Sequence, residues 1–439
     1  MIDRYTTPAM TAIWSRQAKY ERWLEVELAI CEAYAESGVI PAEEMERISA
    51  AARFDLARCD EIEKVTQHDL MAFVRNVSEN VSPPESGDRS SRWIHFGVTS
   101  YDVIDTALGM MLRDSCDVLR DSLGRLRSQI GRLMDEYGST PCIGRTHGIH
   151  AEPITFGHKL DGWSEELARS EARISQCRRE LSVGKISGAV GIHAHVSPDL
   201  EARICEKLGL SADPSSTQII ARDRHANFLS VLAVLAGSLE RIATELRNLQ
   251  RTEILEVQEA FSSGQTGSSA MPHKRNPWNS ETICGLARVV RGNAHAMLES
   301  VMTWHERDLT NSSVERIVFP DTLQLVDFMV NRLTRILSGL VVLPENMARN
   351  LRLMGDLVFS EHVMVALIEA GMSREEAYQT AQRHAAAAWD GADFRTSVSG
   401  DPEVASRLSP EQIEEAFSLE HHLRHAPKRL STQPAPGTG

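Results

Sequence analysis

The chain has 439 residues, of which 42% are hydrophobic and 25% are charged, a balance typical of globular proteins with a large core. The formal net charge of −14 at pH 7 argues against a general affinity for nucleic acid or for anionic membranes. The seven cysteines are scattered and form no C-x-x-C pair, so we expect neither a disulfide framework nor a zinc site.

The sequence also bears on the compartment and on the number of domains. The first residues, MIDRY, lack the basic and then apolar layout of a signal peptide. No stretch approaches about 18 uncharged apolar residues, the length needed to span a membrane. We therefore expect a cytoplasmic protein without a membrane span. At ~150 residues per domain, the length predicts about three domains.

Residues 1–99 are predicted to form a small N-terminal helical domain. Helical patterns cover residues 18–37 and 42–52, and glycines and prolines interrupt them. His68 lies in the run TQHD and, considered alone, is best explained as a structural histidine.

The run HFGVTSYD at residues 95–102 directly precedes the first long helical pattern. Thr99 and Asp102 have the spacing of a capping box, although Asp stands where Glu is usual. Structural capping explains these two residues adequately. The same helix start could also receive a carboxylate, because the N-terminal end of a helix carries partial positive charge.

Five long segments between residues 100 and 347 have apolar residues at helical spacing. They cover residues 103–137, 160–181, 228–249, 281–302 and 321–340. Helices of ~35 residues are ~50 Å long and can bury such stripes only against one another. The sequence therefore predicts an all-α fold with a long central helical bundle. The length of the stripes also favours packing between subunits, although periodicity alone does not separate this from packing within one chain.

The run GRTHGIHAEP at residues 144–153 lies between the first two long segments. His147 and His150 are three residues apart, a spacing that can bind a metal on a helix, but Gly148 and Pro153 disfavour a regular helix. No third metal ligand lies nearby in the sequence. A histidine on a glycine-flanked turn is better suited to transferring protons near neutral pH.

The run SSGQTGSSAMPHKRNP at residues 262–277 interrupts two strong helical patterns. Its His-Lys-Arg-Asn part is a dense cluster of cations and hydrogen-bond donors between two prolines. The helix expected to begin near Ser280 and Glu281 would direct its free N–H groups toward an anion. A solvated interhelical loop is the alternative, but this composition favours a functional loop on a rigid scaffold.

The run NSSVER at residues 311–316 precedes the last long segment. Its paired hydroxyls beside Arg316 suit a phosphate group, because a guanidinium can bind phosphate through two hydrogen bonds. Considered alone, this is a weak motif.

The remaining segments are shorter. Residues 348–439 are predicted to form a C-terminal helical domain with helices at 374–390 and 410–417 and a disordered tail at 431–439. Residues 184–196 are a candidate for a short β segment.

Together, these runs resemble the fumarase/aspartase superfamily of lyases. GSSAMPHKRNP at residues 267–277 is similar to the signature loop of that superfamily, and from Ile2 to about residue 425 the chain resembles its adenylosuccinate lyase family. The matches outside the loop are RY at 4–5, QHD at 67–69, HFGVTS at 95–100, RTH at 145–147, STQ at 216–218, RDRH at 222–225 and SSVER at 312–316.

The resemblance implies an all-α subunit of three domains, at residues 1–99, 100–347 and 348–439, that forms a homotetramer. It implies that three subunits contribute to each active site. The implied reactions, in purine biosynthesis, are cleavage of adenylosuccinate to AMP and fumarate and of the succinylated aminoimidazole carboxamide ribotide to its amide. The implied partners are these small molecules, with no cofactor, metal, nucleic acid or membrane.

The resemblance also implies roles for individual side chains. Ser268 would be the general base and His147 the general acid, although the sequence does not decide which of them takes the first proton. Lys274, Glu281 and His68 complete the candidate catalytic set. The candidate substrate-binding residues are Arg4, Tyr5, Gln67, Asp69, His95, Thr99, Ser100, Gln218, Ser269, Arg275, Asn276, Ser312, Ser313 and Arg316.

Three alternatives stay open. Argininosuccinate lyase, fumarase and the cycloisomerase acting on carboxymuconate have similar loops, but His147 and the SSVER run favour the adenylosuccinate lyase family. A lyase for another amine-bearing succinate gains slight support from Thr282, where the family usually has Asn; Ile149 also replaces the usual Gln. A non-catalytic helical scaffold is disfavoured because the residues of the candidate catalytic set are intact.

Overall fold

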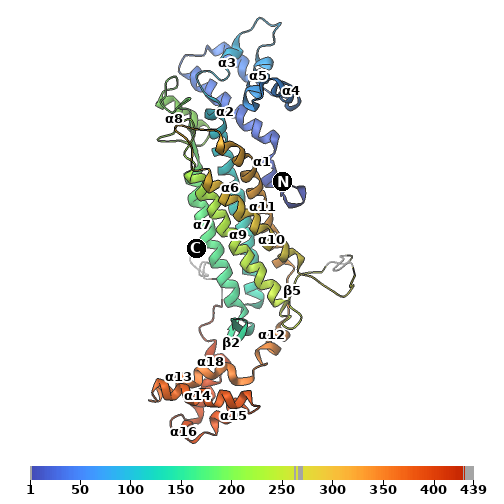
Figure 1. Ribbon diagram of the computed structural model, residues 1–439, viewed down its shortest axis with the longest axis vertical. Coiled ribbons are helices and arrows are strands. Elements are labelled where there is room, and N and C mark those ends of the chain that lie inside the picture. Colours follow the sequence, from blue (N-terminus) through green and yellow to red (C-terminus); the bar gives the residue numbers. More distant parts are fainter. Residues whose placement is uncertain (1, 262–263, 265–269, 429, 431–439) are drawn as a thin grey trace. The chain divides into compact units, whose positions relative to one another are not determined.

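The computed structural model describes residues 2–261, 264, 270–428 and 430. Helices dominate these residues, and strands pair there only in three two-stranded sheets (Figure 1). The predicted all-α fold class is therefore confirmed. The tail at 431–439, which was predicted to be disordered, lies outside the described residues.

The internal contacts of the chain divide it into two compact units. Unit 1 contains residues 1–124, 169–239 and 283–332, and unit 2 contains residues 125–168, 240–282 and 333–439. Five long helices contribute residues to both units: α6 (Ser100–Tyr137), α7 (Phe156–Leu181), α9 (Asp223–Leu249), α10 (Trp278–Glu299) and α11 (Thr310–Ser338). The division into three domains at residues 99 and 347 stays a prediction.

The five long helices occur where the apolar spacing predicts them, with one difference. The predicted start of the last helix was wrong, because α11 begins at Thr310 and contains Pro320. Proline usually ends a helix, since it lacks an N–H and crowds the carbonyl four residues earlier. Here the turns before Pro320 are held by the buried ion pair between Glu315 and Arg222. The run at residues 311–316 therefore lies inside α11 rather than before it.

Ion pairs of Arg222 join three of the long helices in unit 1. Arg222, directly before α9, is 2% exposed, and its two terminal nitrogens lie 2.7 and 2.8 Å from the carboxylate oxygens of Asp105 on α6. Its Nε lies 2.7 Å from Oε1 of Glu315 on α11. A buried charge is tolerated when it is paired and hydrogen-bonded in this way. The network therefore fixes the first turns of α11 against α6.

The N-terminal part of unit 1 consists of short helices around an aromatic core. They are η1 (Asp3–Tyr5), α1 (Pro8–Trp14), α2 (Arg16–Glu36), α3 (Ala42–Ala51), α4 (Leu56–Thr66), α5 (Asp69–Val81) and η2 (Ser90–Trp93). The ring of Tyr20 lies 4.6 Å from that of Trp23 and 5.7 Å from that of Phe73, measured between centroids. The predictions for α2 and α3 are confirmed, whereas α4 and α5 were not predicted.

The predicted β segment at residues 184–196 was largely wrong. Only Val183–Gly184 (β3) forms a strand there, and it pairs in parallel with Ser211–Ala212 (β4). Gly188 and Gly191 both have positive φ, which bends the chain into turns instead of extending it. The helix α8 (Pro198–Lys207) follows this loop.

Unit 2 contains a β-hairpin and the C-terminal helices. The hairpin consists of β1 (Pro141–Thr146) and β2 (Ile149–Thr155), and a second small sheet pairs β5 (Val257–Gln258) with β6 (Val341–Val342). The helices are α12 (Pro344–Leu351), η3 (Gly355–Phe359), α13 (Ser360–Glu369), α14 (Arg374–Trp389), α15 (Phe394–Ser399), α16 (Pro402–Ala405), α17 (Pro410–Ala416) and α18 (Leu419–His422). The helices predicted at 374–390 and 410–417 are confirmed as α14 and α17. Ile143 of the hairpin belongs to the hydrophobic core of these C-terminal helices.

The helix α9 contains a long apolar stretch. Among the described residues it alone is long and apolar enough to cross a membrane by length and composition. More than half of its most apolar window is buried, and Leu232, Leu235 and Leu239 are 0% exposed. Core packing therefore explains its composition, and the helix is only a weak indication of a membrane span.

Candidate active site

His147 occupies the tip of the β-hairpin in unit 2. Thr146 pairs with Ile149, so His147 and Gly148 form a two-residue turn in which both residues have positive φ, 54° and 79°. Two positive φ angles are the requirement of a type I′ turn, the tightest connection between antiparallel strands. The imidazole of His147 is consequently exposed on a short, well-defined support.

The hairpin geometry also bears on the metal alternative. His150 pairs with Arg145 across the two strands instead of following His147 on a helix. Among the described residues, no group of three or more His, Cys, Asp and Glu side chains is arranged to hold a metal ion. The expectation that this chain needs neither metal nor cofactor stays a prediction.

A buried ion pair anchors the hairpin next to His147. Nη2 of Arg145 lies 2.6 Å from Oε1 of Glu256, whose side chain is almost fully buried. Nδ2 of Asn350 on α12 donates to the same oxygen at 2.8 Å. Because two donors satisfy the buried carboxylate, Arg145 is held in one position, and the neighbouring turn is held with it.

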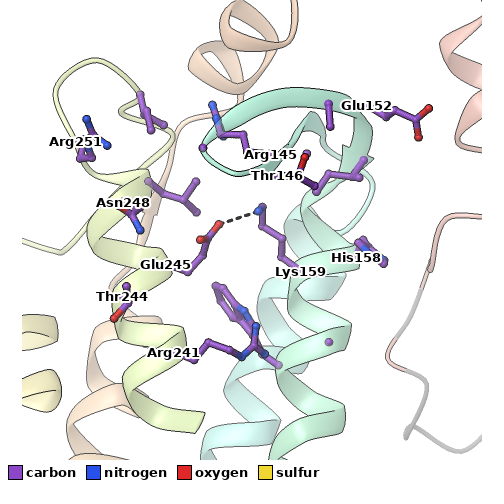
Figure 2. Close-up of a pocket in the computed structure, with 18 residues that line it drawn as sticks. Arg145, Thr146, Glu152, His158, Lys159, Arg241, Thr244, Glu245, Asn248 and Arg251 are labelled. Atoms are coloured by element: carbon purple, nitrogen blue, oxygen red, sulfur yellow. Dashed lines mark hydrogen bonds and ion pairs between the residues drawn. The ribbon is translucent and has the colours of Figure 1, made fainter. Parts of the chain in front are cut away.

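A polar cavity of about 850 Å³ lies beside the hairpin within unit 2 (Figure 2). Arg145 and Thr146 contribute one wall, Lys159 of α7 another, and Glu245 and Asn248 of α9 a third. Nζ of Lys159 lies 2.8 Å from Oε1 of Glu245, so opposite charges face each other in the cavity. Its walls could therefore hold a polar molecule.

The described part of the candidate loop presents its charged side chains to solvent. Lys274 and Arg275 are exposed, and Asn276 is half-buried. The backbone oxygen of Arg275 accepts a hydrogen bond from Nε2 of Gln250 at 3.1 Å, and its guanidinium lies 5.1 Å from the centre of the Phe261 ring. These contacts hold the C-terminal end of the loop against Gln250, directly after α9, and against Phe261.

Ser268 and Ser269 lie outside the described residues. Their predicted roles as general base and substrate ligand therefore stay predictions. Glu281, a member of the candidate catalytic set, is exposed in the first turn of α10. Among the described residues, the structure gives no contact between His147 and either Glu281 or Lys274.

A second group of candidate residues gathers in unit 1, at α5 and the start of α11. Nη1 of Arg316 lies 2.7 Å from Oδ2 of Asp69, and Nζ of Lys19 lies 3.8 Å from the same oxygen. Burial alone would raise the pKa of Asp69, but the hydrogen bond and charge of Arg316, together with the charge of Lys19, lower it below its usual range. Asp69 therefore remains a carboxylate that positions two cations.

These cations border a cavity of about 310 Å³. Lys19, Tyr101, Ser312 and Arg316 contribute polar groups to its lining, and Trp23 contributes an aromatic surface. Ser313, one residue further along α11, is exposed. Gln67 and His68 are exposed beside Asp69, where Nδ1 of His68 accepts from the backbone N–H of Met71 at 3.4 Å and caps α5.

His95 is hydrogen-bonded to the fully buried carboxylate of Glu27. Its Nδ1 lies 2.7 Å from Oε1 of Glu27, and its backbone N–H donates to Oε2 of the same residue at 2.9 Å. Burial disfavours the charged imidazole, but the hydrogen bond and negative charge of Glu27 raise the pKa of His95 above its ordinary value. His95 is thereby suited to face an anion.

Thr99 and Ser100 form the start of α6. The backbone N–H of Thr99 donates to Oδ2 of Asp102 at 2.8 Å, which is one half of the predicted capping box. Gln218 is held from both ends of its amide: Oε1 accepts from Nη1 of Arg307 at 2.9 Å, and Nε2 donates to the backbone oxygen of Ala189 at 3.0 Å.

Arg4 and Tyr5 are not joined to this group. The ring of Tyr5 packs on Phe328, with 5.4 Å between the centroids, whereas Asp69 contacts Arg316 twelve residues earlier on the same helix. At a rise of ~1.5 Å per residue, these two places on α11 are ~18 Å apart. The contacts of unit 1 therefore separate Arg4 and Tyr5 from Arg316.

Comparison with known proteins decides the family. A family model described as "Lyase" matches residues 3–292, and one described as "Adenylosuccinate lyase C-terminus" matches residues 356–431. The chain is 50% identical to "Adenylosuccinate lyase" of Synechocystis sp., over 96% of this chain and 97% of that protein. This chain belongs to the adenylosuccinate lyase family. It is likewise 47% identical to "Adenylosuccinate lyase" of Bacillus subtilis, over 97% of each protein.

Solved structures of other enzymes share the fold of this adenylosuccinate lyase family member. A fumarate lyase from Mesorhizobium sp. BNC1 matches with a TM-score of 0.86 and 26% identity, over 96% of each chain. A 3-carboxy-cis,cis-muconate lactonizing enzyme from Pseudomonas putida matches with a TM-score of 0.84 and 29% identity, over 95% of this chain and 94% of that chain. The chain is accordingly an enzyme of the lyase class that acts on small molecules.

Several charged residues that support the candidate site were not found from the sequence of this adenylosuccinate lyase family member. Glu256 holds Arg145, Glu27 holds His95, and Arg307 holds Gln218. Glu259 caps α10, because its carboxylate accepts from the backbone N–H and the hydroxyl of Ser280 at 2.9 and 2.6 Å. These charges lie among other charged residues in the sequence, so no local pattern identifies them or their partners.

The second strand of the hairpin carries a titratable contact. Glu152 on β2 is hydrogen-bonded to Glu361 on α13, and burial, that hydrogen bond and the charge of Glu361 raise the pKa of Glu152 to about 7. The two residues line a cavity of about 530 Å³ together with His362, His421 and Arg424. The contact is therefore formed by a carboxylic acid and a carboxylate, and it weakens when both groups ionise.

Glu152→Gln is expected to stabilise the protein progressively as the pH rises from 5 to 8.5. The pKa of Glu152 is higher in the folded than in the unfolded protein, so its contribution to stability is fully present below the unfolded-state pKa. This contribution is lost as the pH rises through about 7 and Glu152 ionises in the folded protein. Glutamine mimics the protonated acid at every pH. The difference in melting temperature between variant and parent, measured by circular dichroism, should therefore grow across this range. Glu369→Gln on the same cavity is the control, and a pH-independent difference for Glu152→Gln would contradict the assignment.

Proposed function

We propose that this chain cleaves adenylosuccinate to AMP and fumarate by β-elimination in the cytoplasm. We extend the proposal to the succinylated aminoimidazole carboxamide ribotide of purine biosynthesis, which carries the same succinyl-amine bond. Identity of 45–50% to adenylosuccinate lyases over nearly the whole chain supports this reaction. The observation that carries the mechanism is the exposed imidazole of His147 on its two-residue turn, beside the anchored Arg145.

The reaction needs an acid and a base on one succinyl group. A weakly acidic C–H proton beta to the nitrogen must be removed, and the departing nitrogen must be protonated. His147 is the proposed general acid, since a neutral-pH proton donor must be exposed to substrate and firmly supported. Ser268 is the proposed general base. Its hydroxyl becomes basic enough only in a pocket that supplies donors and positive charge, for which Lys274 is the candidate.

The developing charge lies on the succinyl carboxylates. Lys274, Asn276 and the start of α6 at Thr99 and Ser100 are the proposed donors, because cations and helix N-termini stabilise charge that grows in the transition state. Candidate ligands for the remaining succinyl or phosphate oxygens are His68, His95, Gln218, Ser269 and Arg275.

The nucleotide end is assigned to the group around α5 and α11. Ser312, Ser313 and Arg316 suit a phosphate, and Ser312 and Arg316 line a cavity together with Trp23 and Tyr101. Asp69 is paired with Arg316 and would position it, and Gln67, two residues before Asp69, is a further candidate ligand. Arg4 and Tyr5, ~18 Å from Arg316 along α11 by helix rise, are proposed to serve the phosphate or ribose in the site of another copy.

A homotetramer with three copies at each active site is part of the proposal. Exposed apolar side chains on the long helices of unit 1 support association: Val234 on α9 is 52% exposed, Val289 on α10 is 48% exposed and Ile317 on α11 is 62% exposed. Apolar side chains at such positions favour burial against another chain.

The alternative of another amine-bearing succinate loses its main support. It rested on Thr282, but the hydroxyl of Thr282 donates to the backbone oxygen of Trp278 at 2.8 Å, one turn earlier in α10. A hydroxyl used within its own helix is less available to select a different substrate.

The test offers adenylosuccinate and argininosuccinate separately to the purified protein and measures fumarate release. We expect fumarate from adenylosuccinate alone. Fumarate only from argininosuccinate would change the substrate, and fumarate from neither would favour the non-catalytic scaffold. Analytical ultracentrifugation of the same sample tests the tetramer.

A further inference from the structure

Lys185 is a lysine with a completely buried side chain. It directly follows β3 in unit 1, and its side chain is 0% exposed. Lysine is almost never fully buried unless it is paired. Its Nζ donates to Oδ1 of Asp102, whose side chain is also 0% exposed, and to the backbone oxygen of Gly188 at 3.2 Å.

The partner of Lys185 stands at the start of α6. Oδ2 of Asp102 accepts from the backbone N–H of Thr99 at 2.8 Å, and Oδ1 accepts from the backbone N–H of Gly188 at 3.1 Å. The carboxylate of Asp102 thus accepts hydrogen bonds from three groups: the backbone of Thr99 before α6, the backbone of Gly188 in the loop after β3, and the ammonium of Lys185. Each contact is short enough to be a good hydrogen bond, so the three segments are fixed together.

The loop after β3 also contacts Gln218. The residue after Gly188, Ala189, accepts the hydrogen bond from Nε2 of Gln218 through its backbone oxygen at 3.0 Å. Gly191 passes so close to the chain before Gln218 that a Cβ there would lie 2.2 Å from the backbone oxygen of Ser216. The loop therefore connects Thr99, proposed to hold a succinyl carboxylate, with Gln218, a candidate ligand of the succinyl or phosphate oxygens. This connection favours the succinyl end for Gln218.

We infer that Lys185 is a positioning residue that arranges Thr99, Ser100 and Gln218 for the succinyl group of the substrate. The inference rests on the proposed function and adds to it a residue that touches no substrate. Lys185 acts through Asp102: its positive charge balances the carboxylate, which can then accept from Thr99 and Gly188 while buried. Without the charge of Lys185, the buried carboxylate of Asp102 would be an uncompensated negative charge at the start of α6. This charge would repel the substrate carboxylate that Thr99 and Ser100 are proposed to bind.

The test separates the succinyl end of the substrate from its nucleotide end. Lys185→Met retains the length and apolar character of the side chain but removes its charge. We expect the KM for adenylosuccinate to rise about tenfold, as for the loss of a charged hydrogen bond, with kcat less affected. Binding of AMP, which lacks the succinyl group, should be unchanged in isothermal titration calorimetry. Equal weakening of both ligands, or no change in KM, would overturn the inference.

Two further variants keep the test decisive. Arg178→Met removes another ion pair of unit 1, in which Arg178 binds Asp117 at 2.7 and 2.8 Å, and should leave both ligands unaffected. If Lys185→Met does not fold, the double variant Lys185→Met/Asp102→Asn removes both buried charges together. It should show the same selective loss for adenylosuccinate, about threefold because an amide can still accept from Thr99. Absence of that selectivity would also overturn the inference.

The parent protein distinguishes this inference from the proposed function. If it releases no fumarate from adenylosuccinate, the proposed function fails before Lys185 is tested. If it does release fumarate and the variants bind both ligands like the parent, only the role of Lys185 fails.

Discussion

Replacing His147 with glutamine is expected to lower turnover of adenylosuccinate by about 10²–10⁴-fold, the range that general acid catalysis contributes. Glutamine has a similar size and can still donate a hydrogen bond, but it cannot deliver a proton to the departing nitrogen. The fold should not change, because His147 is exposed on a turn and its side chain belongs to no core. Fumarate release measures the turnover, and circular dichroism measures the fold.

His150→Gln is the matched control for this variant. His150 lies on the same hairpin, paired with Arg145, and burial lowers its pKa below that of a free imidazole. It has no proposed part in proton transfer, so its replacement should leave kcat within about threefold of the parent, an effect of well under 1 kcal/mol. Near-normal turnover of His147→Gln would remove His147 from the mechanism.

Ser268→Ala is expected to have an effect of similar size on kcat. Removing the hydroxyl removes the proposed base for the C–H proton, whereas substrate binding depends on other groups. The neighbouring variant Ser269→Ala is the comparison, because a substrate ligand should affect KM more than kcat. A Ser268→Ala protein that turns over like the parent would show that another group takes the proton.

The same two variants test whether active sites are shared between copies. If His147 and Ser268 of one site come from different subunits, mixing the two inactive proteins after reversible dissociation restores intact sites. Random mixing at equal amounts would restore about a quarter of the parent activity, because each of the two positions is intact in half of the copies. No recovery in verified mixed oligomers would place both residues in one subunit and contradict the shared site.

The sequence predicts the fold correctly where apolar residues recur at helical spacing over many turns. The apolar spacing in α6, α7, α9 and α10 extends over many turns, so short-range information decides the structure there. The β-hairpin had no comparable signal. Its strands are six and seven residues long, the register shifts between Ile143 and Arg145, and Pro153 lies within β2. Alternation over so few residues is not visible in the sequence.

Sequence patterns nominated the residues of the candidate site, and their roles stay predictions, but the patterns did not indicate the residues that support them. Runs such as RTH and NSSVER identify polar groups on a helical scaffold, and the structure places Arg316 beside Asp69 as part of one group. The supporting pairs join residues far apart in sequence: 83 positions separate Asp102 from Lys185, and 111 separate Arg145 from Glu256. Such partners depend on tertiary packing, which local patterns do not specify.

The network of Arg222 also determines when one part of this protein can be completed during synthesis. Its partners Asp105 and Glu315 lie 117 and 93 positions away, on opposite sides in the sequence. A ribosome releases Asp105 first, Arg222 second and Glu315 last, and closing such large loops is entropically costly. The first turns of α11 therefore obtain their buried counter-ion only after Asp105 and Arg222 have emerged and met, so that the proposed phosphate pocket cannot be completed before the chain has been synthesised to about Pro320.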